Sequence, residues 1–263
     1  MMRNILIISF LIILTINKLY GDDKLTISVA SSLYNVSKEL VKEWEKTNNK
    51  RITIITGSTP LLARQIDRGQ KSDIIITANY SWLKWMIDKN LIEESSIKEI
   101  AKNSLVFISG INKNIYLDIN SFEFKNDLME QISSSKISIP NPSSVPLGIY
   151  SKQALKSLNA WSLVQEKLVF TSSAQSNLKF ISQGEANIGI SYLSDALFSS
   201  KVKIISYIDI KKFNYDKPTY WAAKIKRNNK NNDFNFLQWL ESEKGQEIFK
   251  NYGFETIYSE END

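Results

Sequence analysis

The chain of 263 residues contains no cysteine and no histidine. Without cysteine it cannot form disulfide bonds, and without both residue types it lacks the common ligands of structural zinc and of haem iron. The same absences exclude Ser-His-Asp and Cys-His catalysis, and they remove the commonest general base of enzymes. An enzyme of this composition would have to work with Asp, Glu, Lys, Tyr, Ser or a cofactor.

The chain also has little excess charge of either sign. It carries 33 Lys and Arg against 28 Asp and Glu, a net charge of +5. No basic stretch is interleaved with aromatic residues, as a groove for single-stranded nucleic acid requires. The locally basic segments "KIKRNNKNND" and "DIKKF" are typical of solvated loops. We therefore expect no nucleic-acid partner.

The first residues, "MMRNILIISFLIILTINKLYGDD", combine Arg3 with an apolar run over residues 5–16. This run is shorter than the ~20 residues of a membrane-spanning helix and is typical of a secretory signal peptide. We expect residues 1–21 to be this signal, cleaved near Gly21. Leu19 departs from the small side chains that usually precede a cleavage site, so an uncleaved anchor is the alternative. No cysteine follows the run, which excludes acylation at a lipobox.

From Lys24 onward, strand-like and helix-like stretches alternate, which indicates an α/β fold with mainly parallel sheets. "LTISVA" (residues 25–30) alternates like a half-buried strand, and apolar residues at helical spacing follow it. The tail, "FNFLQWLESEKGQEIFKNYGF", is predicted to be helical with an interruption at Gly245 and an end at Gly253. Further strands are expected in "SDIIITA", "NSLVFI", "KISIP", "KVKIISY" and "PTYWAAKIK".

No long low-complexity linker divides the chain. We therefore expect two α/β lobes joined by crossing strands rather than two independent domains. Lobe 1 would comprise residues 22–103 and be completed by the C-terminal helices within residues 218–263. Lobe 2 would comprise residues 104–217.

Four predicted strands end in short breaks rich in Ser, Thr, Gly or Pro, each followed by a helix. Such a break can be a plain helix cap, in which a hydroxyl accepts a bond from a free backbone N–H. Ligands of open α/β sheets, however, bind beyond the carboxyl ends of the strands, where helix N-termini carry partial positive charge. The residues alone leave both interpretations open. The breaks are Ser31-Ser32, Gly57-Ser58-Thr59-Pro60, Pro146-Leu147-Gly148 and Ser172-Ser173-Ala174.

Six segments occur in the order found in the periplasmic molybdate-binding proteins of ABC transporters, which the chain resembles over residues 24–256. This resemblance implies a two-lobed periplasmic binding-protein fold (type II) that closes on molybdate or tungstate in the cleft between the lobes. It further implies a monomer in the periplasm that hands the oxyanion to an ABC importer permease, without catalysis and without a cofactor. The segments are "VASSLYNV", "GSTPLLARQI", "SDIIITANYSWL", "NPSSVPLGIYSKQAL", "GEANIGISYLSDA" and "GQEIFKNYGF".

The resemblance also implies the oxyanion ligands, all of them neutral donors. Ser32 matches a family serine that donates its hydroxyl and backbone N–H, and Thr59 falls where a second serine usually lies. Leu147 and Ala174 match positions that give only backbone N–H groups. Tyr192 matches a tyrosine whose hydroxyl reaches the anion. No side chain would bind the metal atom directly.

Other ligands and another class of protein remain as alternatives. Sulfate differs from molybdate mainly in size, and ferric iron is bound by relatives that use adjacent tyrosines. Tyr192 is flanked by Ser191 and Leu193, which disfavours iron. An enzyme built on the same fold is the third alternative, and the missing histidine and cysteine disfavour it. Arg64 is interpreted as a solvated or ion-paired helix residue that does not touch the anion.

Overall fold

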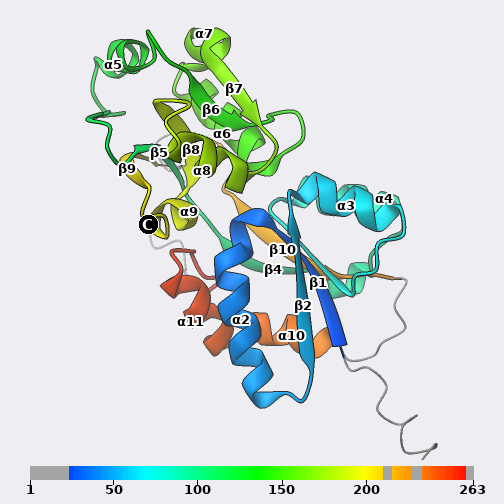
Figure 1. The fold of residues 1–263 in the computed structure, drawn as a ribbon. Coiled ribbons are helices and arrows are strands. Elements are labelled where there is room, and N and C mark those ends of the chain that lie inside the picture. Colours follow the sequence, from blue (N-terminus) through cyan, green and yellow to red (C-terminus); the bar gives the residue numbers. More distant parts are fainter. Residues whose placement is uncertain (1–23, 210–214, 227–232, 259–263) are drawn as a thin grey trace, which may run out of the picture.

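The computed structural model describes residues 24–209, 215–226 and 233–258, so the predicted signal at residues 1–21 lies outside the described residues. Figure 1 shows two units, each a sheet flanked by helices. Each sheet has five strands, in the orders β2-β1-β3-β10-β4 and β7-β6-β8-β5-β9. We call the first sheet with its helices lobe 1 and the second lobe 2. The prediction of a two-lobed α/β fold is confirmed.

Lobe 1 draws its elements from both ends of the described chain, which are blue to cyan and orange to red in Figure 1. Its strands are β1 (Lys24–Ala30), β2 (Arg51–Gly57), β3 (Ile74–Thr77), β4 (Lys98–Lys102) and β10 (Thr219–Lys224). Its helices are α2 (Tyr34–Thr47), α3 (Thr59–Asp67), α4 (Tyr80–Asp88), α10 (Asp233–Leu240) and α11 (Glu243–Asn251), with 3-10 turns η1 (Ser31–Leu33) and η2 (Glu94–Ser96).

Lobe 2 comes from the middle of the chain, green to yellow in Figure 1. Its strands are β5 (Leu105–Gly110), β6 (Ile137–Pro140), β7 (Leu168–Thr171), β8 (Ile188–Tyr192) and β9 (Val202–Ile208). Its helices are α5 (Phe124–Gln131), α6 (Pro146–Ser157), α7 (Trp161–Val164), α8 (Ala174–Ser182) and α9 (Leu193–Leu197), with the 3-10 turn η3 (Gln165–Lys167).

Both sheets are mixed, where the sequence pattern predicts mainly parallel ones. β1 pairs in parallel with β2 and β3, and β6 pairs in parallel with β7 and β8. β10 and β5 run antiparallel to both of their neighbours. The chain crosses between the lobes just before β5 and again before β10. Each of these strands therefore starts at the sheet edge facing the other lobe, where the parallel strands end.

The core of each lobe lies on both faces of its sheet. In β3, Ile74 and Ile76 pack with α2 and α11 on one face, while Ile75 packs with α3 and α4 on the other. Successive side chains of a strand point to opposite faces, so an apolar strand of this kind needs helices on both sides. The strands are thereby packed on both faces, and their ends support the loops that follow.

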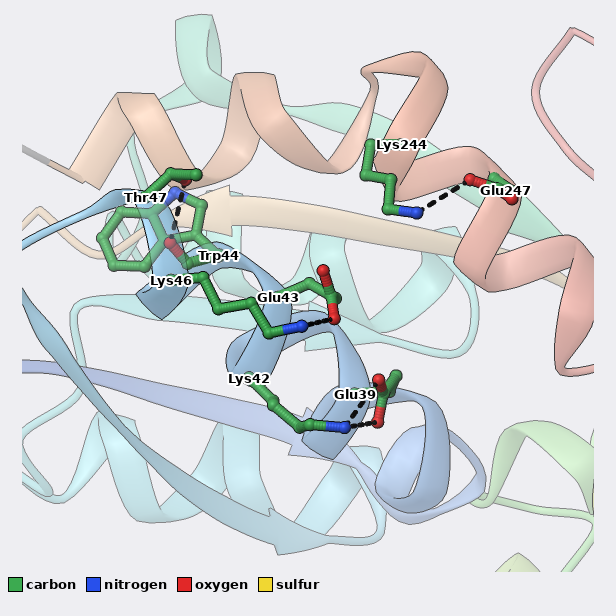
Figure 2. A network of polar contacts seen from close by, with 8 residues as sticks. All are labelled: Glu39, Lys42, Glu43, Trp44, Lys46, Thr47, Lys244 and Glu247. Atoms are coloured by element: carbon green, nitrogen blue, oxygen red, sulfur yellow. Dashed lines mark hydrogen bonds and ion pairs between the residues drawn. The ribbon is translucent and has the colours of Figure 1, made fainter.

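Helix α2 shows which interactions hold a flanking helix in place. Its buried face presents Leu40 and Trp44 to the core, and Trp44 packs edge-on against the ring of Phe236. Its exposed face carries ion pairs between neighbouring turns, among them Lys42–Glu39 at 3.0 Å (Figure 2). Exposed pairs of this spacing contribute only ~0.2–0.5 kcal/mol each, so burial of the apolar face dominates.

The C-terminal helical region differs from its predicted form. The break falls at residues 241–242, and Gly245 lies inside α11 rather than at an interruption. A Cβ atom at Gly245 would lie 2.5 Å from the carbonyl oxygen of Trp239, so glycine is needed for close packing of the two helices. The predicted end at Gly253 is confirmed, because α11 stops at Asn251. Within the described residues, no helix combines the length and apolarity that crossing a membrane requires.

Candidate functional site

The loops at the carboxyl ends of the parallel strands converge on one small cavity between the lobes. Its volume is about 10 Å³, which is room for about one water molecule. Helix α8 of lobe 2 contacts the η1 turn of lobe 1 across it. All five residues that the family resemblance singles out line this cavity. Its lining is Ala30, Ser31, Ser32, Ser58, Thr59 and Ala78 from lobe 1, with Val145, Pro146, Leu147, Ala174 and Tyr192 from lobe 2.

On the lobe 1 side, the hydroxyls of Ser32 and Thr59 already accept hydrogen bonds from within the protein. Thr59 Oγ1 accepts from the backbone N–H of Ala78 at 3.2 Å, and Ser32 Oγ accepts from the hydroxyl of Tyr220 at 3.0 Å. Neither η1 nor α3 has a side-chain N-cap, so the simple capping interpretation does not hold for either break. Each hydroxyl that accepts a bond keeps its own proton to donate.

On the lobe 2 side, Leu147 and Ala174 lie in the first turns of α6 and α8. Backbone N–H groups of a first turn have no acceptor within their own helix. At α8, the hydroxyl of Ser173 caps the helix by accepting from Ser176 N at 3.0 Å. This cap does not use the N–H of Ala174. At α6, which begins earlier than its predicted start, a Cβ on Gly148 would lie 2.2 Å from the carbonyl oxygen of Pro140. Glycine therefore lets the helix N-terminus approach the end of β6.

Tyr192 closes the cavity at the end of β8. The residue is 1% exposed, and its hydroxyl has no hydrogen-bond partner among the described residues. A buried hydroxyl without a partner is unfavourable by ~1–3 kcal/mol, so native proteins seldom keep one unless it serves another purpose. Burial raises the pKa of Tyr192 well above its ordinary value. The hydroxyl therefore stays protonated and available as a donor.

The cavity lining contains no charged side chain. One acid that interacts electrostatically with Tyr192 is Asp195, in the first turn of α9, which is 5% exposed and accepts from Gln175 Nε2 at 3.1 Å. Burial raises the pKa of Asp195 to about 8, so its carboxyl is neutral at pH 7. The N-termini of α6 and α8 then contribute partial positive charge at the cavity with no charged side chain in its lining.

A larger groove of about 570 Å³ lies next to the cavity and shares Ser58 and Val145 with it. Arg64 of α3 and Arg68, directly after that helix, line this groove and not the cavity. Arg64 lies over the ring of Trp82, 5.5 Å from its centroid. Trp82 in turn donates from Nε1 to the carbonyl oxygen of Ser144 at 2.7 Å, a hydrogen bond that joins the two lobes.

Two buried residues linked to the site by hydrogen bonds, Tyr220 and Asn103, could not be predicted from the sequence. Tyr220 lies in an ordinary strand pattern, and Asn103 directly precedes another strand, so neither carries a local signal. Both are fully buried, and the topology brings Asn103, Tyr220 and Ser32 together from distant parts of the chain. Among the described residues, no group of three or more Asp or Glu side chains could hold a metal ion.

Comparison with known proteins agrees with this two-lobed architecture. The family model for bacterial extracellular solute-binding proteins matches residues 25–255. The chain belongs to this family. This solute-binding protein is 29% identical to the molybdate-binding protein ModA of Escherichia coli K12 over 241 residues. The alignment covers 90% of this chain and 91% of the relative.

A second relative of this solute-binding protein is ModA of Haemophilus influenzae, 28% identical over 234 residues, with 88% and 89% of the two chains covered. Among solved structures, the periplasmic molybdate-binding protein of Azotobacter vinelandii superposes with a TM-score of 0.74 at 19% identity. That alignment covers 88% of the solute-binding protein and 98% of the other chain. At this identity the structural likeness establishes the shared fold alone.

Proposed function

We propose that this solute-binding protein captures molybdate or tungstate in the cavity between its lobes and delivers it to an ABC importer permease. The observation that carries the proposal is a buried cavity whose predicted ligands, Ser32, Thr59, Leu147, Ala174 and Tyr192, come from both lobes and offer only neutral donors. Relatives similar along nearly the whole chain are molybdate-binding proteins.

Neutral donors suit a fully ionised oxyanion. A buried dianion without hydrogen bonds would be strongly unfavourable, whereas several N–H and O–H groups can satisfy its oxygens. Because Ser32, Thr59 and Tyr192 have hydroxyl protons to give, the site needs no arginine or lysine. No protein group would bind the metal atom itself, and no cofactor takes part.

Capture requires the lobes to move. The cavity has room for about one water molecule, and a tetrahedral oxyanion is larger than water, so the anion would enter when the lobes are further apart. The anion would first meet the hydroxyls of Ser32 and Thr59 on lobe 1, and closure would then add the donors of lobe 2. We assign residues 22–103 and 218–263 to lobe 1 and residues 104–217 to lobe 2, so that the chain would cross between the lobes at residues 103–104 and 217–218.

The cellular setting follows from the same proposal. The signal at residues 1–21, cleaved near Gly21, would deliver a monomeric protein to the periplasm. There it would recognise the anion and the permease, with no nucleic-acid partner and no catalytic activity.

Calorimetric titration of the protein lacking residues 1–21 tests the proposal. Molybdate and tungstate should each bind one to one, and Ser32→Ala should weaken this binding by roughly 10- to 100-fold, as loss of a hydrogen bond to a charged group does. The matched control is Ser242→Ala, because Ser242 accepts from Gly245 N at 3.2 Å in a helix cap. Ser32→Ala loses the internal hydrogen bond from Tyr220. Ser242→Ala loses the bond from Gly245 N and also the bond that Ser242 donates to the carbonyl oxygen of Trp239 at 2.6 Å, yet only the first variant should bind more weakly. Heat from sulfate alone, or from none of the anions, would contradict the proposal.

A further inference from the structure

A chain of buried hydrogen bonds leads from the junction of the lobes to the cavity. Asn103, fully buried between β4 and β5, donates from Nδ2 to Ser194 Oγ at 2.8 Å and to Tyr220 Oη at 3.3 Å. The Tyr220 hydroxyl donates to Ser32 Oγ at 3.0 Å. The chain thus connects α9 of lobe 2 with β10 and η1 of lobe 1.

Backbone groups fix the direction of the bonds that Asn103 makes in this chain. Asn103 Oδ1 accepts from the N–H of Ser104 at 2.9 Å and from the N–H of Ser194 at 3.5 Å. A backbone N–H can only donate, so the amide oxygen must face these two groups and the NH₂ group must face Tyr220. Tyr220 Oη then accepts a hydrogen bond from the amide and donates its own proton to Ser32 Oγ, its acceptor among the described residues.

Ser32 is left with one possible role. Its oxygen already accepts a hydrogen bond from Tyr220, and no described group accepts a hydrogen bond from its hydroxyl. Ser32 also lines the cavity. We propose that Asn103 and Tyr220 are positioning residues that hold Ser32 as a hydrogen-bond donor to the bound oxyanion. The inference rests on the proposed function, and it adds that the donor-only character of this position is set by residues that never touch the ligand.

A double-mutant cycle tests this coupling. Tyr220→Phe removes one oxygen and keeps the ring, which packs 5.9 Å from the Tyr192 ring and 5.5 Å from the Phe254 ring between centroids. Tyr220→Phe should weaken molybdate binding by roughly 3- to 10-fold, since an unanchored Ser32 hydroxyl is no longer held toward the anion. In the Ser32→Ala background the same change should alter affinity by less than about twofold.

A second measurement separates positioning from general damage. Once Tyr220 no longer donates to it, the Ser32 hydroxyl can rotate and accept a hydrogen bond from the O–H of hydrogen phosphate, so Tyr220→Phe should reduce the preference for molybdate over hydrogen phosphate. Asn103→Asp keeps the shape and the acceptor for Ser104, but cannot donate to Tyr220. It should also lose affinity, because the Tyr220 proton then turns toward the new carboxylate. Thermal unfolding of each variant would check that the substitution leaves the protein folded.

The matched control is Tyr215→Phe, which removes another buried hydroxyl, one that donates to the carbonyl oxygen of Ile208 at 2.9 Å. It should leave molybdate affinity unchanged. Equal losses from Tyr220→Phe with and without Ser32 would overturn the positioning role while leaving the proposed function intact. If the unmutated protein binds no oxyanion, the proposed function fails, and the positioning role fails with it.

Discussion

Replacing Tyr192 with phenylalanine should make the protein more stable and a weaker binder at the same time. The hydroxyl of Tyr192 is buried without a partner among the described residues, and the residue lines the cavity between the lobes. Removing it relieves the unfavourable burial of a polar group in the free protein. It also removes one donor to the oxyanion.

The two effects differ in size. An unsatisfied buried hydroxyl is unfavourable by ~1–3 kcal/mol, so Tyr192→Phe should raise the free energy of unfolding by about 1 kcal/mol. In a chain of this length that corresponds to roughly 2–4 °C in the melting temperature. A hydrogen bond to a charged ligand is worth ~1.5–3 kcal/mol, so affinity for molybdate should fall by roughly 10- to 100-fold.

Thermal unfolding at several molybdate concentrations measures both effects together. Without ligand the Tyr192→Phe variant should melt above the unmutated protein, and at saturating molybdate the order should reverse, because stabilisation by a ligand grows with its affinity. The control is Tyr215→Phe, whose hydroxyl has a partner, and which should melt lower at every concentration. A Tyr192→Phe variant that melts lower without ligand, or binds molybdate unchanged, would refute the assignment of this hydroxyl to the ligand.

Three further predictions concern the surroundings of the cavity. Burial raises the pKa of Asp195 to about 8, so molybdate affinity should be constant below that pH and fall above it, as a carboxylate forms near the dianion. Asp195→Asn should abolish this fall, and a fall that persists in titrations of the variant would assign it elsewhere. Arg64→Gln with Arg68→Gln should slow molybdate association in stopped-flow measurements by roughly 3- to 10-fold at low salt and very little at high salt, with dissociation unchanged. The matched control, Arg51→Gln at the far end of β2, should have no effect, and an equal effect would exclude local steering. Trp82→Phe removes one of the hydrogen bonds between the lobes, the bond from Trp82 to Ser144, and should speed molybdate release by roughly 2- to 10-fold; an unchanged release rate would show that this bond does not help to hold the lobes together.

Much of the fold follows from local patterns in the sequence. The alternation in "LTISVA" and the helical spacing of Leu40 and Trp44 correspond to β1 and the buried face of α2. Where tertiary contacts decide, the patterns mislead. Leu61 shares its helix with Leu62 yet is 50% exposed, because it faces the groove between the lobes. "KEIAK", with two lysines and a glutamate, gives no strand pattern, but pairing with β10 makes it β4.

The residues of the candidate site also fall into two groups, those with a local sequence signal and those without one. Ser32 and Thr59 stand out locally, as hydroxyls between a strand and a helix. Leu147 and Ala174 give no signal of their own, since only their backbone N–H groups would act, and a family resemblance was needed to single them out. No local pattern could indicate Tyr220, because its contact with Ser32 joins residues 188 positions apart.

The most direct test of the central claim is a crystal structure with molybdate, with anomalous diffraction measured at the molybdenum absorption edge. We predict one strong peak between the lobes. Its oxygens should lie within hydrogen-bond distance of the hydroxyls of Ser32, Thr59 and Tyr192 and of the backbone N–H groups of Leu147 and Ala174. A peak in the arginine-lined groove beside the cavity, or no peak between the lobes, would contradict the account.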